Sequence, residues 1–112
     1  MELNGQTEGA DVLVVALRVD NLDASNVHEF RDAVQALIGE HSRVVLGLSS
    51  VKFLDSSGLG SLIFCLRQLN GRRGDFRLCG LSPTVQALFE LMRLQRVFRI
   101  FGNRPEAVAS FE

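Results

Sequence analysis

Four short hydrophobic runs recur along the chain and predict β-strands. They lie at residues 12–19, 43–49, 75–79 and 97–101. The first two are rich in valine and leucine and are almost uninterrupted by polar residues, a pattern typical of strands covered on both faces of a sheet. The third alternates polar and apolar positions, as a strand does. We therefore expect residues 12–19 to form a central strand of a sheet.

Segments with the spacing of amphipathic helices follow these runs. Two of the helix starts carry cap signals: Asn26 stands three residues before Glu29, and Ser82 directly precedes Pro83. The predicted helices span about residues 26–39, 58–70, 82–92 and 103–111. The core-facing positions of the third helix are expected to be Val85, Leu88, Phe89 and Met92.

The order of these elements predicts an α/β fold. Strands that alternate with helices favour largely parallel pairing with right-handed crossovers. Because the chain has no linker, internal repeat or low-complexity segment, residues 1–112 are expected to form one domain.

Composition excludes several classes of protein. Hydrophobic residues make up 46% and charged residues 22% of the chain, which argues against disorder and against a disulfide scaffold. Cys65 and Cys79 lie in apolar surroundings and read as buried thiols, and no spacing suggests a metal site. We expect no cofactor.

The sequence also predicts where the protein is located. With no basic or apolar leader and no run near the ~20 apolar residues of a membrane span, a cytoplasmic protein is expected.

Charge is distributed unevenly between the two halves of the chain. Residues 1–42 carry eight acidic and two basic side chains, whereas residues 43–112 carry five acidic and ten basic ones. The sequence pI near 6.1 argues against a nucleic-acid partner, because such binding needs a concentrated basic face. The nearest candidate is the group Arg67, Arg72, Arg73 and Arg77, which we interpret as a solvated helix end and turn.

The most informative segment is Asp55-Ser56-Ser57-Gly58, between a buried strand and a helix. Sites in parallel α/β sheets lie beyond the carboxyl ends of strands, where helix N-termini present free N–H groups. Gly58 and Gly60 lower helix propensity in the first turn, so we expect close approach of another backbone. The alternative is that Ser56 or Ser57 simply caps the helix.

The segment Phe53-Leu54-Asp55-Ser56-Ser57-Gly58-Leu59-Gly60 closely resembles the signature of STAS domains, specifically of bacterial anti-sigma factor antagonists. The similarity extends to Leu22-Asp23-Ala24, to residues 77–83 and to residues 88–92, so it covers nearly the whole chain. The resemblance implies a STAS-like domain, with a mixed, mostly parallel sheet of four to five strands and about four helices.

The resemblance also implies a function for this segment. In the family, the second serine of the motif is phosphorylated by a kinase that is also the anti-sigma factor, and by position this serine is Ser57. Phosphorylation of Ser57 would abolish binding to the anti-sigma factor. The residues expected to form the partner-binding site are Asp23, Leu54, Asp55, Ser56, Ser57, Gly58 and Leu59. The chain would regulate transcription without being an enzyme.

The partners implied by the resemblance are an anti-sigma factor and serine kinase of the histidine-kinase-type ATPase fold, and a PP2C-type phosphatase. No nucleic acid or membrane partner is implied, and the chain is expected to be a monomer or a weak dimer. The sequence departs from the family at Gly47, where many relatives have aspartate, and at Val19-Asp20-Asn21-Leu22, where relatives commonly have a glycine-containing turn.

Two rival functions need residues that this sequence does not place near the motif. A hydrolase would need a base beside Ser57, but the only histidines, His28 and His41, are expected at the surface. A phosphate-binding loop would need a lysine after the glycines, and Lys52 is the only lysine. The closer alternative is a STAS regulatory or accessory module of a transport, secretion or signalling-scaffold complex.

Overall fold

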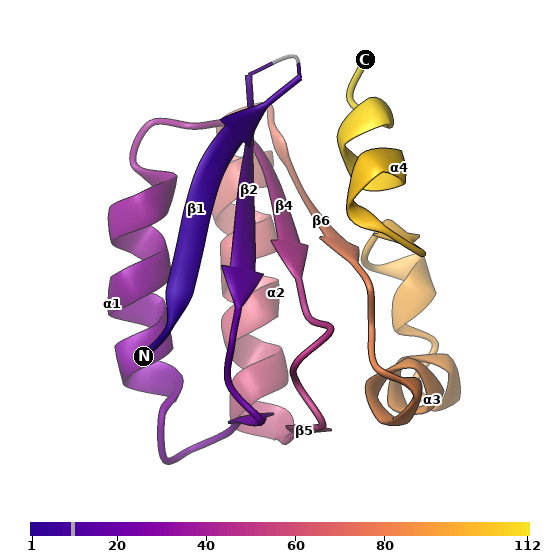
Figure 1. The fold of residues 1–112 in the computed structure, drawn as a ribbon. Helices are drawn as coiled ribbons and strands as arrows, with labels where there is room; N and C mark the ends of the chain where they lie inside the picture. The colour runs from indigo at the N-terminus through magenta and orange to yellow at the C-terminus, as the bar shows by residue number, and fades with distance from the viewer. Residues whose placement is uncertain (10) are drawn as a thin grey trace.

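A computed structural model describes residues 1–9 and 11–112, in which five strands form the main sheet in the order β1-β2-β4-β6-β7 (Figure 1). The strands are β1 (Leu3–Glu8), β2 (Val12–Leu17), β4 (Arg43–Gly47), β6 (Asp75–Cys79) and β7 (Ile100–Phe101). β1 pairs antiparallel with β2, and the other neighbours are parallel. The predicted α/β architecture, with a mixed and mostly parallel sheet, is confirmed.

The hydrophobic pattern of the sequence does not predict strand β1. It forms a hairpin with β2 and lies at the edge of the sheet, and most of its residues are exposed. Because an edge strand with an open face needs few apolar side chains, its sequence Leu-Asn-Gly-Gln-Thr-Glu carries no hydrophobic run. β2 consequently occupies an inner position, as predicted.

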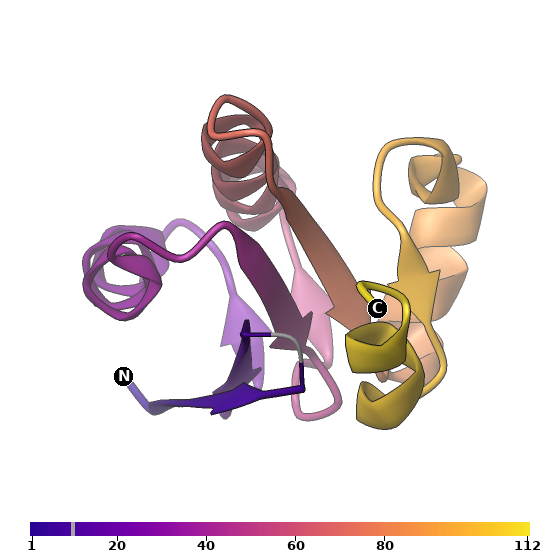
Figure 2. The ribbon, with the colours of Figure 1, turned by 90° about the horizontal axis from the view of Figure 1, so that it is seen from above.

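The helices divide between the two faces of the sheet. Helices α1 (Val27–Ile38) and α2 (Ser56–Asn70) cover one face, and α4 (Arg104–Ala109) covers part of the other, as the view from above shows (Figure 2). Helix α3 (Pro83–Leu91) lies beyond β6, near the end of the sheet. The larger core cluster, which includes Phe30, Leu46 and Leu62, therefore fills the space under α1 and α2.

A smaller core cluster lies under α4. Val14 from β2 and Val45 from β4 pack there against Ala107 and Val108. The predicted burial of both thiols is confirmed, because Cys65 belongs to the larger cluster and Cys79 to the smaller one, and both are free.

The last predicted strand is much shorter than expected. Only Ile100–Phe101 pairs with β6, while Phe98 packs against the rings of Phe76 and Phe89 in the core. A 3₁₀ turn, η1 (Leu94–Arg96), precedes it. The apolar run at 97–101 is thus partly a buried segment without strand pairing and partly a strand. Periodicity cannot distinguish these two structures over so short a length.

The prediction that Met92 faces the core is wrong, since its side chain is 50% exposed. Helix α3 ends at Leu91, and Arg93 adopts a left-handed conformation with φ of 56°, so the periodicity no longer applies at Met92. Val85 and Phe89 are buried as expected.

The structure confirms the cap signal at Ser82 but not the one at Asn26. The side chain of Ser82 accepts a hydrogen bond from the N–H of Val85, and that of Asn103 from the N–H of Glu106. Asn26 occupies the N-cap position of α1 but makes no side-chain cap bond. Its carboxamide instead bridges the backbone on either side of Leu22: it accepts from the N–H of Asp23 and donates to the carbonyl oxygen of Asn21.

Candidate functional site

A two-stranded parallel ladder builds the candidate site. Strands β3 (Asn21–Leu22) and β5 (Phe53–Leu54) pair at the end of the molecule where α2 begins (Figure 1). Asn21 is opposite Phe53, and Leu22 is opposite Leu54. Because both strands run the same way, the turn after β3 and the helix start after β5 emerge side by side. This arrangement brings Asp23 to the Asp-Ser-Ser-Gly segment.

Asp55 is the N-cap of α2. One carboxylate oxygen accepts a hydrogen bond from the N–H of Gly58 at 2.8 Å, and the other accepts one from the N–H of Ala24 at 3.1 Å. The alternative that Ser56 or Ser57 caps the helix is therefore wrong. Aspartate caps as well as serine does, and its second oxygen allows it to hold the neighbouring turn too.

Gly58 and Gly60 have different structural roles. A Cβ atom on Gly58 would lie 2.2 Å from the carbonyl oxygen of Leu22, so the close backbone approach expected at Gly58 is confirmed. A Cβ on Gly60 would meet nothing within 4 Å, so the same expectation is wrong for Gly60. Only Gly58 allows α2 to start directly against β3.

Ser56 and Ser57 are exposed and lie in the first turn of α2. Within the described chain, neither hydroxyl takes part in a hydrogen bond with a histidine or with any other residue. His28 is exposed as predicted, whereas His41 is half-buried. The first-turn N–H groups of a 15-residue helix and its dipole favour negative charge at this position.

The carboxylate of Asp23 is held within its own turn. It accepts hydrogen bonds from the side chain and backbone of Ser25 and from the side chain of Asn21. These bonds, led by the Ser25 hydroxyl, lower the pKa of Asp23. The site thus presents an ionised aspartate and two free serine hydroxyls on adjoining turns.

The two leucines of the expected partner-binding site have little exposed surface. Leu54 and Leu59 are only 5% and 9% exposed and pack into the core. Phe53, in contrast, is 56% exposed. It borders a groove of about 210 Å³ between β5 and α3, whose lining residues are Lys52, Phe53, Leu54, Thr84, Val85 and Leu88. This groove is not evident from the sequence, because only the fold brings α3 beside β5.

Two further features of the described residues concern metal ions and membranes. Among residues 1–9 and 11–112, no group of three or more histidine, cysteine, aspartate or glutamate side chains is placed to hold a metal ion. None of the helices described in these ranges is both long enough and apolar enough to span a membrane.

Comparison with known proteins identifies relatives. The family model described as STAS domain matches residues 6–107. The chain is 31% identical over 81 residues to the anti-sigma F factor antagonist of Paenibacillus polymyxa, an alignment that covers 72% of this chain and 68% of the relative.

Solved structures show the same fold. An anti-sigma-factor antagonist (STAS) domain protein from Planctomyces limnophilus matches with a TM-score of 0.84 and 22% identity, covering 96% of each chain. The anti-sigma factor antagonist SpoIIAA in its unphosphorylated form matches with a TM-score of 0.76 and 22% identity, covering 98% of this chain and 96% of that one. Its phosphorylated form, from Bacillus, matches with a TM-score of 0.70 and 21% identity over 99% of this chain and 100% of that one.

Proposed function

Since the chain belongs to the STAS domain family, we propose that it acts as an anti-sigma factor antagonist whose binding to an anti-sigma factor is abolished by phosphorylation of Ser57. The relative from Paenibacillus polymyxa, which is 31% identical, is named an anti-sigma F factor antagonist. SpoIIAA, which shares the fold, is known in an unphosphorylated and a phosphorylated form. The unphosphorylated chain would be the active form.

The exposed hydroxyl of Ser57 in the first turn of α2 is the observation that supports this proposal most strongly. A kinase can reach it, and no described residue competes for it with a hydrogen bond. A phosphate adds about 1.5 to 2 negative charges, which the helix N-terminus accommodates. Because Asp55 already caps the helix through Gly58, the fold does not depend on the Ser57 hydroxyl.

The same modification would block a partner that covers this surface. A docked anti-sigma factor would remove Ser57 from water, and a buried charge without a partner costs several kcal/mol. Asp23 and Asp55 lie on the adjoining turns, and their negative charges would repel the phosphate and so add to this cost. A cost of about 4 kcal/mol weakens binding roughly a thousandfold.

The groove beside Phe53 offers the partner an apolar anchoring point. It adjoins the Asp-Ser-Ser-Gly segment through Leu54, and its wall is formed by Val85 and Leu88 of α3. An anti-sigma factor that inserts an apolar side chain there would cover Phe53 and reach Ser57 at the same time. Aromatic and aliphatic anchors of this kind supply much of the affinity of protein interfaces.

The partners in this proposal are the two enzymes implied by the family resemblance. A serine kinase of the histidine-kinase-type ATPase fold, which is itself the anti-sigma factor, would transfer phosphate from ATP to Ser57. A PP2C-type phosphatase would restore the hydroxyl. The chain itself supplies no catalytic group in this cycle, and no cofactor is required.

The test is phosphorylation by a candidate kinase from the same genome in the presence of ATP, followed by peptide mapping. We expect one phosphate on Ser57 in the wild-type chain and in Ser56→Ala, and none in Ser57→Ala. Modification of Ser56 or Ser61 in place of Ser57 would contradict the assignment.

A capture experiment tests separately whether the partner is an anti-sigma factor. Ser57→Ala chain on a solid support should retain the ATPase-fold kinase from a cell extract, and the retained kinase should also bind a sigma factor. Retention of a transport or secretion component, with no kinase, would favour the accessory-module alternative.

A further inference from the structure

The face of the sheet opposite α1 and α2 is only partly covered. Helix α4 packs over Val14 and Val45, but β1 and the end of β2 remain open on this face (Figure 2). In the strand register, Asn4, Ala16, Gly47 and Cys79 form one row across β1, β2, β4 and β6. Within this row, the small side chain of Ala16 leaves space between β1 and the end of β2.

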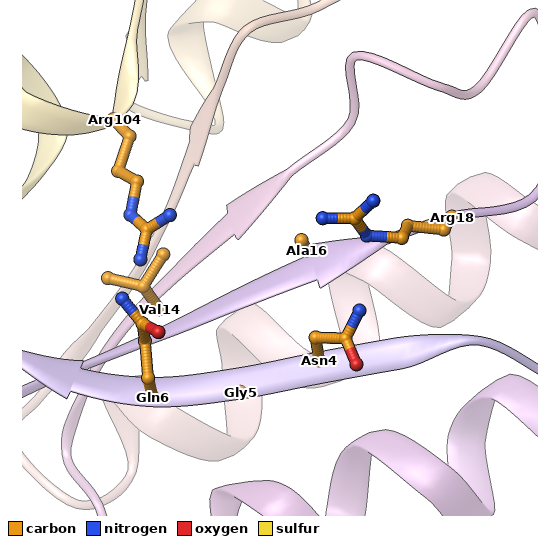
Figure 3. A pocket seen from close by; sticks show the side chains of 7 residues that line it. All are labelled: Asn4, Gly5, Gln6, Val14, Ala16, Arg18 and Arg104. Atoms are coloured by element: carbon orange, nitrogen blue, oxygen red, sulfur yellow. The ribbon is translucent and has the colours of Figure 1, made fainter.

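A cavity of about 100 Å³ lies on this open face. Its lining residues are Asn4, Gly5, Gln6, Val14, Ala16, Arg18 and Arg104. In Figure 3 the side chains of Asn4, Gln6, Arg18 and Arg104 all stand on the same side of β1 and β2, with Val14 and Ala16 between them. The two guanidinium groups come from the end of β2 and the start of α4.

The charges around this cavity are unbalanced in favour of an anion. Two arginines line it, and none of its lining residues is acidic. Arg18 is exposed, and its guanidinium makes no ion pair or hydrogen bond within the described chain. Arg104 donates from Nε to the Glu8 carboxylate, which fixes the side chain and leaves its terminal nitrogens without a partner among the described residues.

The polar groups match a tetrahedral oxyanion. Guanidinium groups pair with phosphate through two parallel N–H···O bonds, and the carboxamides of Asn4 and Gln6 can donate further N–H groups. Donors therefore stand on several sides of a small hollow, and a phosphate has oxygens on several sides. We propose that this cavity binds the phosphate group of a small phosphorylated molecule, or inorganic phosphate itself, between Arg18 and Arg104.

This site is separate from the Ser57 surface. The cavity lies on the face opposite α1 and α2, whereas Ser57 is on α2 itself. The proposal therefore does not rest on the antagonist function, and either can fail without the other.

The test is a titration of the ¹⁵N-labelled full chain with inorganic phosphate, followed by NMR of backbone and arginine Nε–H signals. Sodium chloride keeps the ionic strength constant, and a parallel titration with chloride alone is the reference. We expect saturable shifts at Gly5, Arg18 and Arg104. Glycerol phosphate in a second series shows whether the site accepts a phosphate ester as well as the free ion.

Variants make the result specific. Arg18→Gln and Arg104→Gln should each weaken phosphate binding about fivefold, and the double variant about 25-fold, since each exposed ion pair contributes up to about 1 kcal/mol. Arg67→Gln, which removes an exposed arginine from the last turn of α2, should change nothing. Shifts no larger than those with chloride, or equal affinity in the double variant, would overturn the proposal.

Discussion

The carboxylate of Asp55 accepts a hydrogen bond from the backbone N–H of Ala24 at 3.1 Å, and so joins two turns that are 31 residues apart in the chain. Its other oxygen caps α2 through Gly58. One side chain therefore orients both the helix that carries Ser57 and the turn that carries Asp23. The aspartate of the motif has a structural role that does not depend on phosphorylation.

Replacing Asp55 should separate the two turns. Asp55→Ala removes the cap, worth about 1 kcal/mol, and a second hydrogen bond of similar size, so we expect a loss of about 2 kcal/mol in the free energy of unfolding. Asp55→Asn keeps one oxygen acceptor and should lose about half as much. Urea denaturation measures both variants, and an unchanged midpoint for Asp55→Ala would show that neither bond contributes.

The two glycines of α2 provide a matched pair of variants. In Gly58→Ala the new methyl group meets the Leu22 carbonyl oxygen, which is backbone and cannot rotate away. We expect a loss of about 2–3 kcal/mol. In Gly60→Ala the methyl group enters open space, and we expect a gain of about 0.5–1 kcal/mol from helix propensity. Thermal unfolding of both variants would reveal the opposite signs, and destabilisation by Gly60→Ala would argue against this interpretation.

Substitutions at Ser57 should separate folding from binding. Ser57→Ala is expected to retain affinity for the anti-sigma factor within about tenfold, whereas Ser57→Asp should lose most of it, because a carboxylate must be desolvated on docking. Both variants should melt like the wild type, since an acidic group in the first turn is favourable to the helix dipole. Calorimetric titration with the partner decides the matter. Equal affinities would mean that charge at this position is not the switch.

Phe53 is expected to contribute to partner binding through its exposed ring. Phe53→Ala should weaken anti-sigma factor binding about tenfold, because it removes an apolar wall of the groove beside the motif. Val97→Ala, at a side chain that is 48% exposed beyond η1, serves as the control and should have no effect. If both variants bind like the wild type, the groove is not part of the interface.

The buried thiols make stability depend on alkaline pH. Burial raises the pKa of Cys65 from its ordinary value of 9.0 to about 11. The folded state therefore favours the protonated thiol. The stabilisation that the buried Cys65 thiol gives the folded state is complete below pH 9.0 and is lost as the pH rises to about 11. The loss amounts to about 2–3 kcal/mol. In Cys65→Ala, the free energy of unfolding should decline less steeply over this pH range, in which the chain has no tyrosine to titrate.

The pattern of apolar residues alone predicts the elements that bury most apolar surface. The helices at Val27–Ile38 and Ser56–Asn70 each show one apolar face, and the inner strands at Val12–Leu17 and Arg43–Gly47 are nearly continuous apolar runs. The Asp-Ser-Ser-Gly motif was found for a different reason, since its residue types are specific to one family and their spacing is fixed by the helix start.

Elements with little buried surface were not predicted. The edge strand Leu3–Glu8 has mostly polar side chains, and the two-residue strands at Asn21–Leu22 and Phe53–Leu54 are too short to show any period. The alternative of a serine cap at Ser56 or Ser57 is wrong because Asp55 forms the cap, and several residue types can accept the same bond at that position.

The sequence by itself therefore determined the α/β class, the family and the segment that carries Ser57, because these depend on local periodicity and on a contiguous motif. The tertiary structure alone decided which side chains share a surface. It buried Leu54 and Leu59 and exposed Phe53 against α3, and it brought Arg18 and Arg104 to one cavity. Such relationships join residues far apart in the chain, and only the pairing of strands and the packing of helices fixes them.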